Sequence, residues 1–169
     1  MAWHGVQIYY YDEDKDGLLL DCVRPLFEQV AAHADRLVFT RHWRRGSHLR
    51  LGVRAGEAAY RETIEPAVDR TVRPYLQTHP STTAVDEPAM LAVHRLLAPQ
   101  EQETGDLAPF RPDNSVHQDP YDRRLPTLGS EAAAALLEDF YHDTNSLVFG
   151  VLEQVRAGRS RMTVALDLM

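Results

Sequence analysis

The fold is most constrained by residues 37–54, where two runs of strand character flank the dipeptide Arg45-Gly46. The spacing predicts a β-hairpin with a two-residue turn at that dipeptide. The strands of this hairpin would run over Leu37 to Arg44 and over Ser47 to Arg54. Because such a turn fixes the register, residues equidistant from it face each other. The predicted cross-strand pairs are Trp43 with His48 and Arg41 with Arg50.

Side chains alternate between the two faces of a hairpin, so this register places Arg41, Trp43, His48 and Arg50 on one face. Two arginines directly opposite each other destabilise a hairpin by about 0.2–1 kcal/mol unless an anion lies between them. The hairpin therefore predicts a site for a carboxylate or phosphate group. The alternative is a solvated sheet face whose arginines pair weakly with some of the chain's own 25 acidic residues.

The composition is that of an ordinary globular chain, with 169 residues and a net charge of −7. The negative charge argues against nucleic-acid binding over the whole surface, and so against a tRNA-dependent ligase role. The single cysteine, Cys22, excludes an internal disulfide and lies in an apolar helical pattern that predicts a core position. We expect a cytoplasmic location, since no apolar stretch could span a membrane and the N-terminus lacks signal-peptide features.

No cofactor or metal is expected. The nucleotide-binding, zinc-protease and α/β-hydrolase motifs are absent. The eight histidines form no closely spaced pair that would indicate a metal site.

The remaining strands and helices are predicted from hydrophobic periodicity and from the glycine, proline and capping residues that bound them. Strands are expected at Trp3 to Tyr11 and at Asn114 to Gln118, the latter at a sheet edge. Helices are expected, in chain order, over Leu18 to His33 with a kink at Pro25, Gly56 to Thr78, Pro88 to Leu97, and from an N-cap at Ser130 to Gly158. Residues Ala98 to Leu128 read mainly as a long irregular loop, and Arg159 to Met169 as either a strand or a broken helix.

This succession predicts an α+β fold in which an antiparallel sheet carries helices packed on one face. Its start, β-α-β-β-α, is that of a ferredoxin-like or split βαβ arrangement. A long irregular loop and a C-terminal helix follow. The other face of the sheet is left open, and a site could form there.

Several segments together resemble a known family. They are W-x-x-x-Q-I-Y-Y from Trp3, L-L-x-x-x-x-x-P-L from Leu18, F-T-R-H from Phe39, S-H-L-R-L from Ser47, P-Y-D-R-R from Pro120, L-G-S from Leu128 and E-D-F-Y-H-D-T-N-S from Glu138. The chain resembles the C-terminal domain of lantibiotic dehydratases, which also occurs as stand-alone thiopeptide-type bacteriocin biosynthesis proteins that include the pyridine synthases. The resemblance covers most of the chain and implies one domain over residues 1–169.

The resemblance implies a peptide-modifying enzyme or enzyme subunit. Such domains either eliminate glutamate from glutamylated serine or threonine, or join two dehydroalanines by a formal cycloaddition. The expected catalytic residues are His48, as a proton carrier, and Arg50. The expected substrate-binding residues are Arg41, Trp43, Tyr121 and Arg124. The expected partners are a precursor peptide with its leader, and a second biosynthetic subunit or another copy of the chain.

The chain also departs from the family pattern. Gly52 stands where the family has a second arginine. Arg124 stands where the family has an acidic residue, and Thr127 where it has a basic one. The family's C-terminal histidine-containing segment is absent. Two interpretations follow: one part of a longer or split enzyme, or a diverged member that performs other chemistry. The alternative function is a non-catalytic module that binds a leader peptide by adding it as a strand to the sheet.

Overall fold

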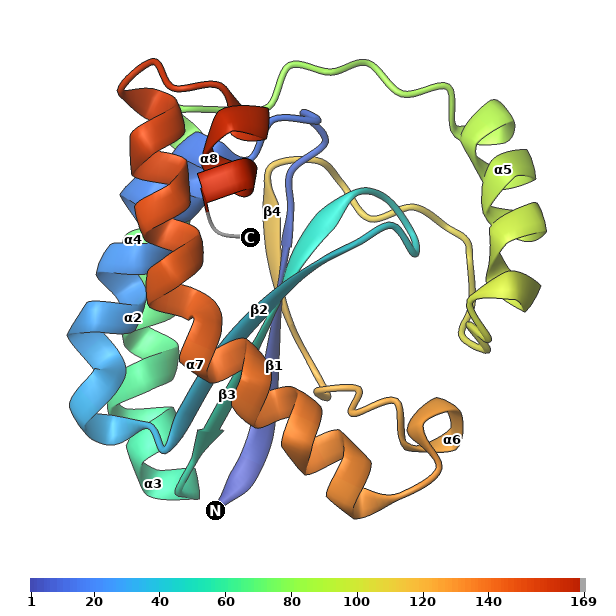
Figure 1. Ribbon diagram of the computed structural model, residues 1–169. Helices are drawn as coiled ribbons and strands as arrows, with labels where there is room; N and C mark the ends of the chain where they lie inside the picture. The colour runs from blue at the N-terminus through green and yellow to red at the C-terminus, as the bar shows by residue number, and fades with distance from the viewer. Residues whose placement is uncertain (168–169) are drawn as a thin grey trace.

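The structure, a computed structural model, describes residues 1–167. The strands over these residues are β1 (Ala2–Tyr9), β2 (Arg36–His42), β3 (His48–Ala55) and β4 (Ser115–Asp119). They form one antiparallel sheet in the order β2-β3-β1-β4 (Figure 1). This order and the β-α-β-β-α-β succession are those of a ferredoxin-like arrangement, so the predicted fold class is confirmed.

The helical segments include two π-helical turns, η1 and η3, and one 3₁₀ turn, η2. In chain order they are α1 (Asp16–Leu18), η1 (Leu19–Val23), α2 (Arg24–Val30), η2 (Ala31–His33), α3 (Glu57–Ala59), η3 (Tyr60–Ile64), α4 (Glu65–Thr78), α5 (Glu87–Gln100), α6 (Leu125–Leu128), α7 (Glu131–Arg156) and α8 (Arg161–Asp167). Pro25 and Pro66 lie in the first turns of α2 and α4, where a missing amide hydrogen is best tolerated. The irregularity expected at Pro25 is thus a π-helical turn just before it.

Helices α2 and α4 cover one face of the sheet and enclose the core (Figure 1). Apolar residues on alternate positions of β1 and β3 point into it, as the strand period requires. Core residues that are at most 2% exposed include Ile8, Leu20, Leu26, Leu49, Leu51, Ile64 and Val72. Cys22 is fully buried among them, which confirms its predicted core position.

Helix α7 begins at the predicted N-cap, where the amide of Ala133 donates to Ser130 Oγ over 3.1 Å. It lies along the outer edge of β2, where Asn145 Nδ2 donates to the carbonyl of Leu37 over 2.7 Å and the Leu37 amide donates to His142 Nδ1 over 3.1 Å. These bonds satisfy backbone groups that an edge strand would otherwise leave unpaired. The N-terminal part of α7 extends toward α6, on the side of the sheet away from α2 and α4 (Figure 1).

The other predicted elements compare well with the structure. The helix expected at Pro88 to Leu97 is α5, and the edge strand expected at Asn114 to Gln118 is β4. The C-terminal stretch that the sequence left undecided contains α8, while Leu168 and Met169 lie outside the described residues. None of the helices in the described part of the chain is both long and apolar enough to cross a membrane.

The predicted hairpin register is wrong by one residue. The last pair is His42 with His48, so the loop has five residues, and the amide of Gly46 donates to the carbonyl of Trp43 over 3.0 Å. The tight turn is thus centred one residue earlier than expected. Ser47, which was expected in the second strand, belongs to the loop, and β3 begins at His48. Because the side-chain period of a strand is two, this shift moves every β2 side chain to the other face relative to β3. Arg50 therefore faces Thr40 rather than Arg41.

Candidate functional site

The open face of the sheet carries polar side chains in rows that run across the strands. One row consists of Gln7, Arg50 and Thr40, and the next consists of Tyr9, His48 and His42. Gln7, Tyr9, His48 and Arg50 are all buried, although α2 and α4 lie on the other face. The irregular segments after α5 and after β4 contribute to this burial, as Glu103 contacts His42 and Tyr121 packs against β3.

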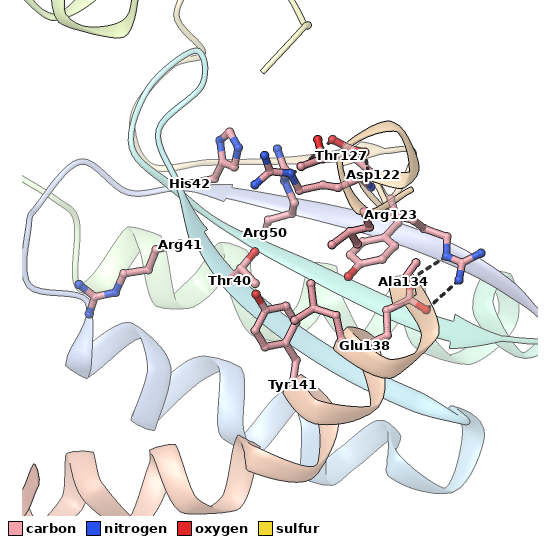
Figure 2. Close-up of a pocket in the computed structure, with 14 residues that line it drawn as sticks. Thr40, Arg41, His42, Arg50, Asp122, Arg123, Thr127, Ala134, Glu138 and Tyr141 are labelled. Carbon is pink, nitrogen blue, oxygen red and sulfur yellow. Dashed lines mark hydrogen bonds and ion pairs between the residues drawn. The ribbon is translucent and has the colours of Figure 1, made fainter. Parts of the chain in front are cut away.

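A cavity of about 210 Å³ opens between this face, α6 and α7 (Figure 2). Its walls come from four parts of the chain, namely the hairpin, the segment after β4, α6 and the start of α7. The side chains drawn around it are those of Thr40, Arg41, His42, Arg50, Tyr121, Asp122, Arg123, Arg124, Thr127, Leu128, Ala134, Leu137, Glu138 and Tyr141. We call it the Arg50 cavity.

Arg50 is the central cation of this cavity and is only 5% exposed. Its Nε and Nη2 atoms are buried without a hydrogen-bond partner in the described part of the chain. The nearest carboxylate oxygen, Asp122 Oδ2, lies 3.8 Å from Nη1, which is too far for a hydrogen bond. Burial lowers the pKa of Arg50, partly offset by Asp122, yet an arginine remains charged at neutral pH. A buried guanidinium with unused donors is an anion or carbonyl site.

His42 and His48 lie beside Arg50, and their hydrogen bonds fix their tautomers. His42 Nδ1 accepts from the amide of Arg44 over 3.0 Å, so its proton resides on Nε2, which lies 3.0 Å from Glu103 Oε2. His48 Nδ1 lies 2.8 Å from the carbonyl of Gly46 and therefore carries the proton, which leaves Nε2 as a free base.

Both imidazoles are neutral at physiological pH. Burial, with the positive charges of Arg50 and Arg44, lowers the pKa of His42 to about 3, partly offset by Asp122. Burial likewise lowers the pKa of His48 to about 3. Of the two, only His42 borders the Arg50 cavity, whereas the His48 ring lies between the rings of His42 and Tyr9, tilted relative to both.

The roof of the site depends on two glycines that are cross-strand partners, Gly5 and Gly52. A Cβ atom on Gly5 would lie 2.4 Å from the carbonyl oxygen of Asp119, and one on Gly52 would lie 2.4 Å from Cε2 of Tyr121. Their missing side chains let the chain cross back over the sheet after β4. Tyr121 is then held by stacking on Trp3, with ring centroids 4.6 Å apart. In this chain, a side chain at position 52 would collide with Tyr121.

The wall on the α7 side is built by an ion pair. Arg123 donates from Nε and Nη2 to the two carboxylate oxygens of Glu138, over 2.7 Å and 3.0 Å, and also contacts Glu131 (Figure 2). This two-point contact ties the segment after β4 to α7. Because its donors are used, Arg123 shapes the cavity while Arg50 keeps donors for a ligand.

The structure places some predicted site residues at the cavity and others elsewhere. Arg41, Arg50, Tyr121 and Arg124 line it. The guanidinium of Arg41 points away, toward the helix face, with Nη2 at 3.7 Å from Asp16 Oδ1 (Figure 2). Trp43 donates from Nε1 to Glu101 over 2.8 Å and packs against His94 of α5, with ring centroids 4.7 Å apart. The predicted facing pair of Arg41 and Arg50 is therefore wrong.

Other lining residues were missed by the sequence analysis. Thr40 and His42 follow from alternation once the loop is counted as five residues, so the signal was present. Asp122, Thr127, Glu138 and Tyr141 come from an irregular segment and two helices, and no local pattern connects them with the hairpin.

The chain matches a family model described as "Lantibiotic biosynthesis dehydratase C-term" over residues 3–169. Among solved structures it is similar to the pyridine synthase TbtD from thiomuracin biosynthesis, with a TM-score of 0.87 and 39% identity over 99% of this chain. The tRNA-dependent lantibiotic dehydratase MibB from Microbispora sp. 107891 gives a TM-score of 0.61 and 20% identity, over 95% of this chain and 12% of that one, and shows the fold alone. No curated protein sequence matches significantly.

The match with TbtD covers 53% of that protein, so the chain spans about half of its length. The family model covers nearly the whole of this chain, which confirms the resemblance inferred from the sequence. The chain belongs to the family of lantibiotic biosynthesis dehydratase C-terminal domains.

Proposed function

We propose that the chain is a peptide-modifying enzyme, or a subunit of one, in thiopeptide-type natural product biosynthesis. Two findings support this. The chain is 39% identical to a pyridine synthase, and its sheet carries a cavity with an unsatisfied cation. The identity favours ring formation from dehydroalanines over elimination of glutamate.

The observation that carries the proposal is the buried guanidinium of Arg50. A buried charge without a close partner lowers stability, because its lost hydration is not replaced by hydrogen bonds. Within the described residues, Asp122 is the nearest carboxylate and is not in hydrogen-bonding contact. Such an arrangement is retained where a ligand completes it. A peptide carbonyl or a carboxylate would supply the missing acceptor.

The chemistry of pyridine formation has a place for this donor. Two dehydroalanines supply four ring carbons, and a backbone amide supplies the fifth carbon and the nitrogen. The amide oxygen must then leave as water. A guanidinium that donates to this oxygen stabilises the negative charge it gains, which is the main role of charged donors in active sites. In an elimination the same group would hold the leaving glutamate carboxylate.

The non-catalytic alternative is supported by the weakness of the bases near the cavity. With a pKa of about 3, His42 is a poor proton acceptor at neutral pH. His48 has a free Nε2 but does not line the cavity. In this alternative the chain binds the precursor peptide and a second subunit performs the chemistry.

Mass spectrometry of a dehydroalanine-containing thiopeptide precursor, incubated with the chain alone and with a candidate second subunit, tests the proposal. Loss of water together with release of the leader segment would identify pyridine formation. The informative variant is Arg50→Lys, which keeps the charge but removes the fork of donors. The matched control is Arg61→Lys in η3, an exposed residue that does not line the cavity.

We expect Arg50→Lys to abolish the mass change, and Arg61→Lys to retain it. Peptide binding by the chain without any mass change would favour the non-catalytic alternative. Equal activity of wild type and Arg50→Lys would overturn the proposed role of the Arg50 cavity.

A further inference from the structure

A second cavity of about 250 Å³ opens on the same face of the sheet. Its lining residues come from β1, the hairpin loop and the end of β4, and are Gln7, Tyr9, Arg44, Arg45, Asp119 and Pro120. It adjoins the Arg50 cavity, because Gln7 is the cross-strand partner of Arg50 on the neighbouring strand. We call it the Gln7 cavity.

The segment after β4 passes between the two cavities. Pro120 borders the Gln7 cavity and the next residue, Tyr121, borders the Arg50 cavity. The close approach of this segment to Gly5 and Gly52 holds it against the sheet. One sheet face is thus divided into two adjacent compartments.

Gln7 is a buried amide whose hydrogen bonds are only half used. It is 8% exposed, and its Oε1 accepts from the hydroxyl of Tyr9 over 2.8 Å. Tyr9 is itself fixed by its contacts with His48 and His117, with ring centroids 4.5 Å and 5.6 Å apart. Gln7 Nε2 makes no hydrogen bond within residues 1–167, so two donor hydrogens at the floor of the cavity remain available.

Asp119 supplies an acceptor in the same cavity. Its Oδ2 lies 3.7 Å from Arg111 Nη2, beyond hydrogen-bonding distance, so the carboxylate can still accept an N–H group. A donor from Gln7 and an acceptor from Asp119 match the C=O and N–H of a peptide backbone. The volume is below the roughly 300–1,000 Å³ of sites for drug-sized ligands, which suits a short peptide segment.

The geometry points to the Gln7 cavity as a second peptide subsite. It binds a backbone amide of one peptide segment through Gln7 and Asp119, while another segment of the same peptide occupies the Arg50 cavity. This inference rests on the proposed function, in which two dehydroalanines distant in sequence must meet. Placing the two segments in adjacent compartments raises their effective concentration without any further contact.

The test is a nuclear magnetic resonance titration of the ¹⁵N-labelled full chain with N-acetyl-dehydroalanine N′-methylamide. This probe carries one alkene and two amides. We expect the side-chain NH₂ signal of Gln7 and the Nε–H signal of Arg50 to shift with separate saturation curves. The key variant is Gln7→Glu, which replaces the donor by an acceptor of the same size. The control is Gln100→Glu at the exposed end of α5, which adds the same charge elsewhere.

Gln7→Glu should weaken binding at the Gln7 cavity about tenfold or more, although its carboxylate also adds a charge beside Arg50. Asp119→Asn exchanges an acceptor for an amide at a position that is not a cross-strand partner of Arg50, so it should weaken the same site while the Arg50 signal saturates as in wild type. A titration in which only Arg50 responds, or in which Asp119→Asn and Arg50→Lys impair a single common curve, would overturn the second subsite. Either result leaves the proposed function to its own test by mass spectrometry, so the two failures are distinguishable.

Discussion

The two faces of the sheet are built by the same strands and are both buried there, but they differ in side-chain chemistry and in the segments that cover them. On the helix face, Val6 and Ile8 of β1 meet Leu49 and Leu51 of β3, and all are buried under regular helices. On the open face, the intervening residues Gln7, Tyr9, His48 and Arg50 are buried as well. The covering there includes the irregular segments 101–111 and 120–124 and the short α6.

This difference shows how one sheet separates stability from function. The helix face follows the rules of a core more closely, because the side chains that β1 and β3 bury there are mainly apolar, although His4 Nε2 is buried without a hydrogen-bond partner in the described residues. The open face breaks them, because His48 Nε2 and two nitrogens of Arg50 are buried without partners in the described part of the chain. Such local violations are expected at functional sites, where stability gained elsewhere compensates for them.

The largest effect on stability is expected on the helix face. Leu51→Ala removes a fully buried side chain and leaves a cavity beside its cross-strand partners Val6 and Phe39. The free energy of unfolding should fall by about 2–5 kcal/mol. Urea denaturation followed by circular dichroism measures it. A loss below about 1 kcal/mol would mean that the helix face is not the main stabilising core.

The next largest effect is a pH dependence that originates on the open face. The pKa values of His42 and His48 are lowered to about 3, so both stay neutral in the folded chain while the unfolded chain takes up protons below about pH 6.5. Their contribution to stability is therefore complete above pH 6.5 and is lost as the pH falls toward 3. The loss is about 1.4 kcal/mol per pH unit for each histidine.

Denaturation of wild type and His48→Gln at pH 7 and pH 5 tests this dependence. The variant should lose less stability on acidification than wild type, because one titrating group is gone. The control is His33→Gln at an exposed position in η2, which should behave as wild type. An identical pH dependence in His48→Gln and wild type would contradict the neutral, buried state of His48.

A smaller effect is expected at Gly52, where the segment after β4 covers the open face. In Gly52→Ala the new Cβ atom would meet Tyr121 Cε2 at 2.4 Å and Val38 Cγ2 at 2.7 Å. Both side chains must shift, which costs about 1–3 kcal/mol, and the stacking of Tyr121 on Trp3 should be disturbed. Tryptophan fluorescence and thermal unfolding report the two changes. Gly150→Ala in α7, with open space around the new atom, should instead be neutral or stabilising by up to about 1 kcal/mol.

The helix face could be predicted largely from the sequence and the open face only in part, for a physical reason. Helix-face elements repeat with the period of a strand or a helix, so β1, the hairpin, α7 and the buried Cys22 were all predictable. The strand order agrees with the ferredoxin-like arrangement predicted from the β-α-β-β-α succession.

The site depended instead on turn geometry and on long-range contacts. One additional loop residue, Ser47, reversed the orientation of Arg41 relative to Arg50, and no propensity distinguishes the two loops strongly. Gly52 and Tyr121 are far apart in the sequence but lie close together in the structure. From the sequence alone, Gly52 is visible only as a departure from the family pattern. Arg50, Tyr121 and Arg124 were predicted as site residues and lie at the cavity, but Asp122, Thr127, Glu138 and Tyr141 were not predicted, since no local pattern connects them with the hairpin.

The smallest effect on stability is expected for the residue with the largest effect on function. Arg50→Met keeps most of the side-chain volume and removes a charge whose Nε and Nη2 lack hydrogen-bond partners. Replacing a poorly paired buried charge by an apolar group of similar size is commonly neutral or stabilising. The unfolding free energy should therefore change by less than about 1 kcal/mol, while binding of the dehydroalanine probe at the Arg50 cavity is lost. Urea denaturation and the probe titration measure the two quantities on the same sample. A loss of several kcal/mol would mean that Arg50 is mainly a structural residue, and the contrast between the two faces would then fail at its central position.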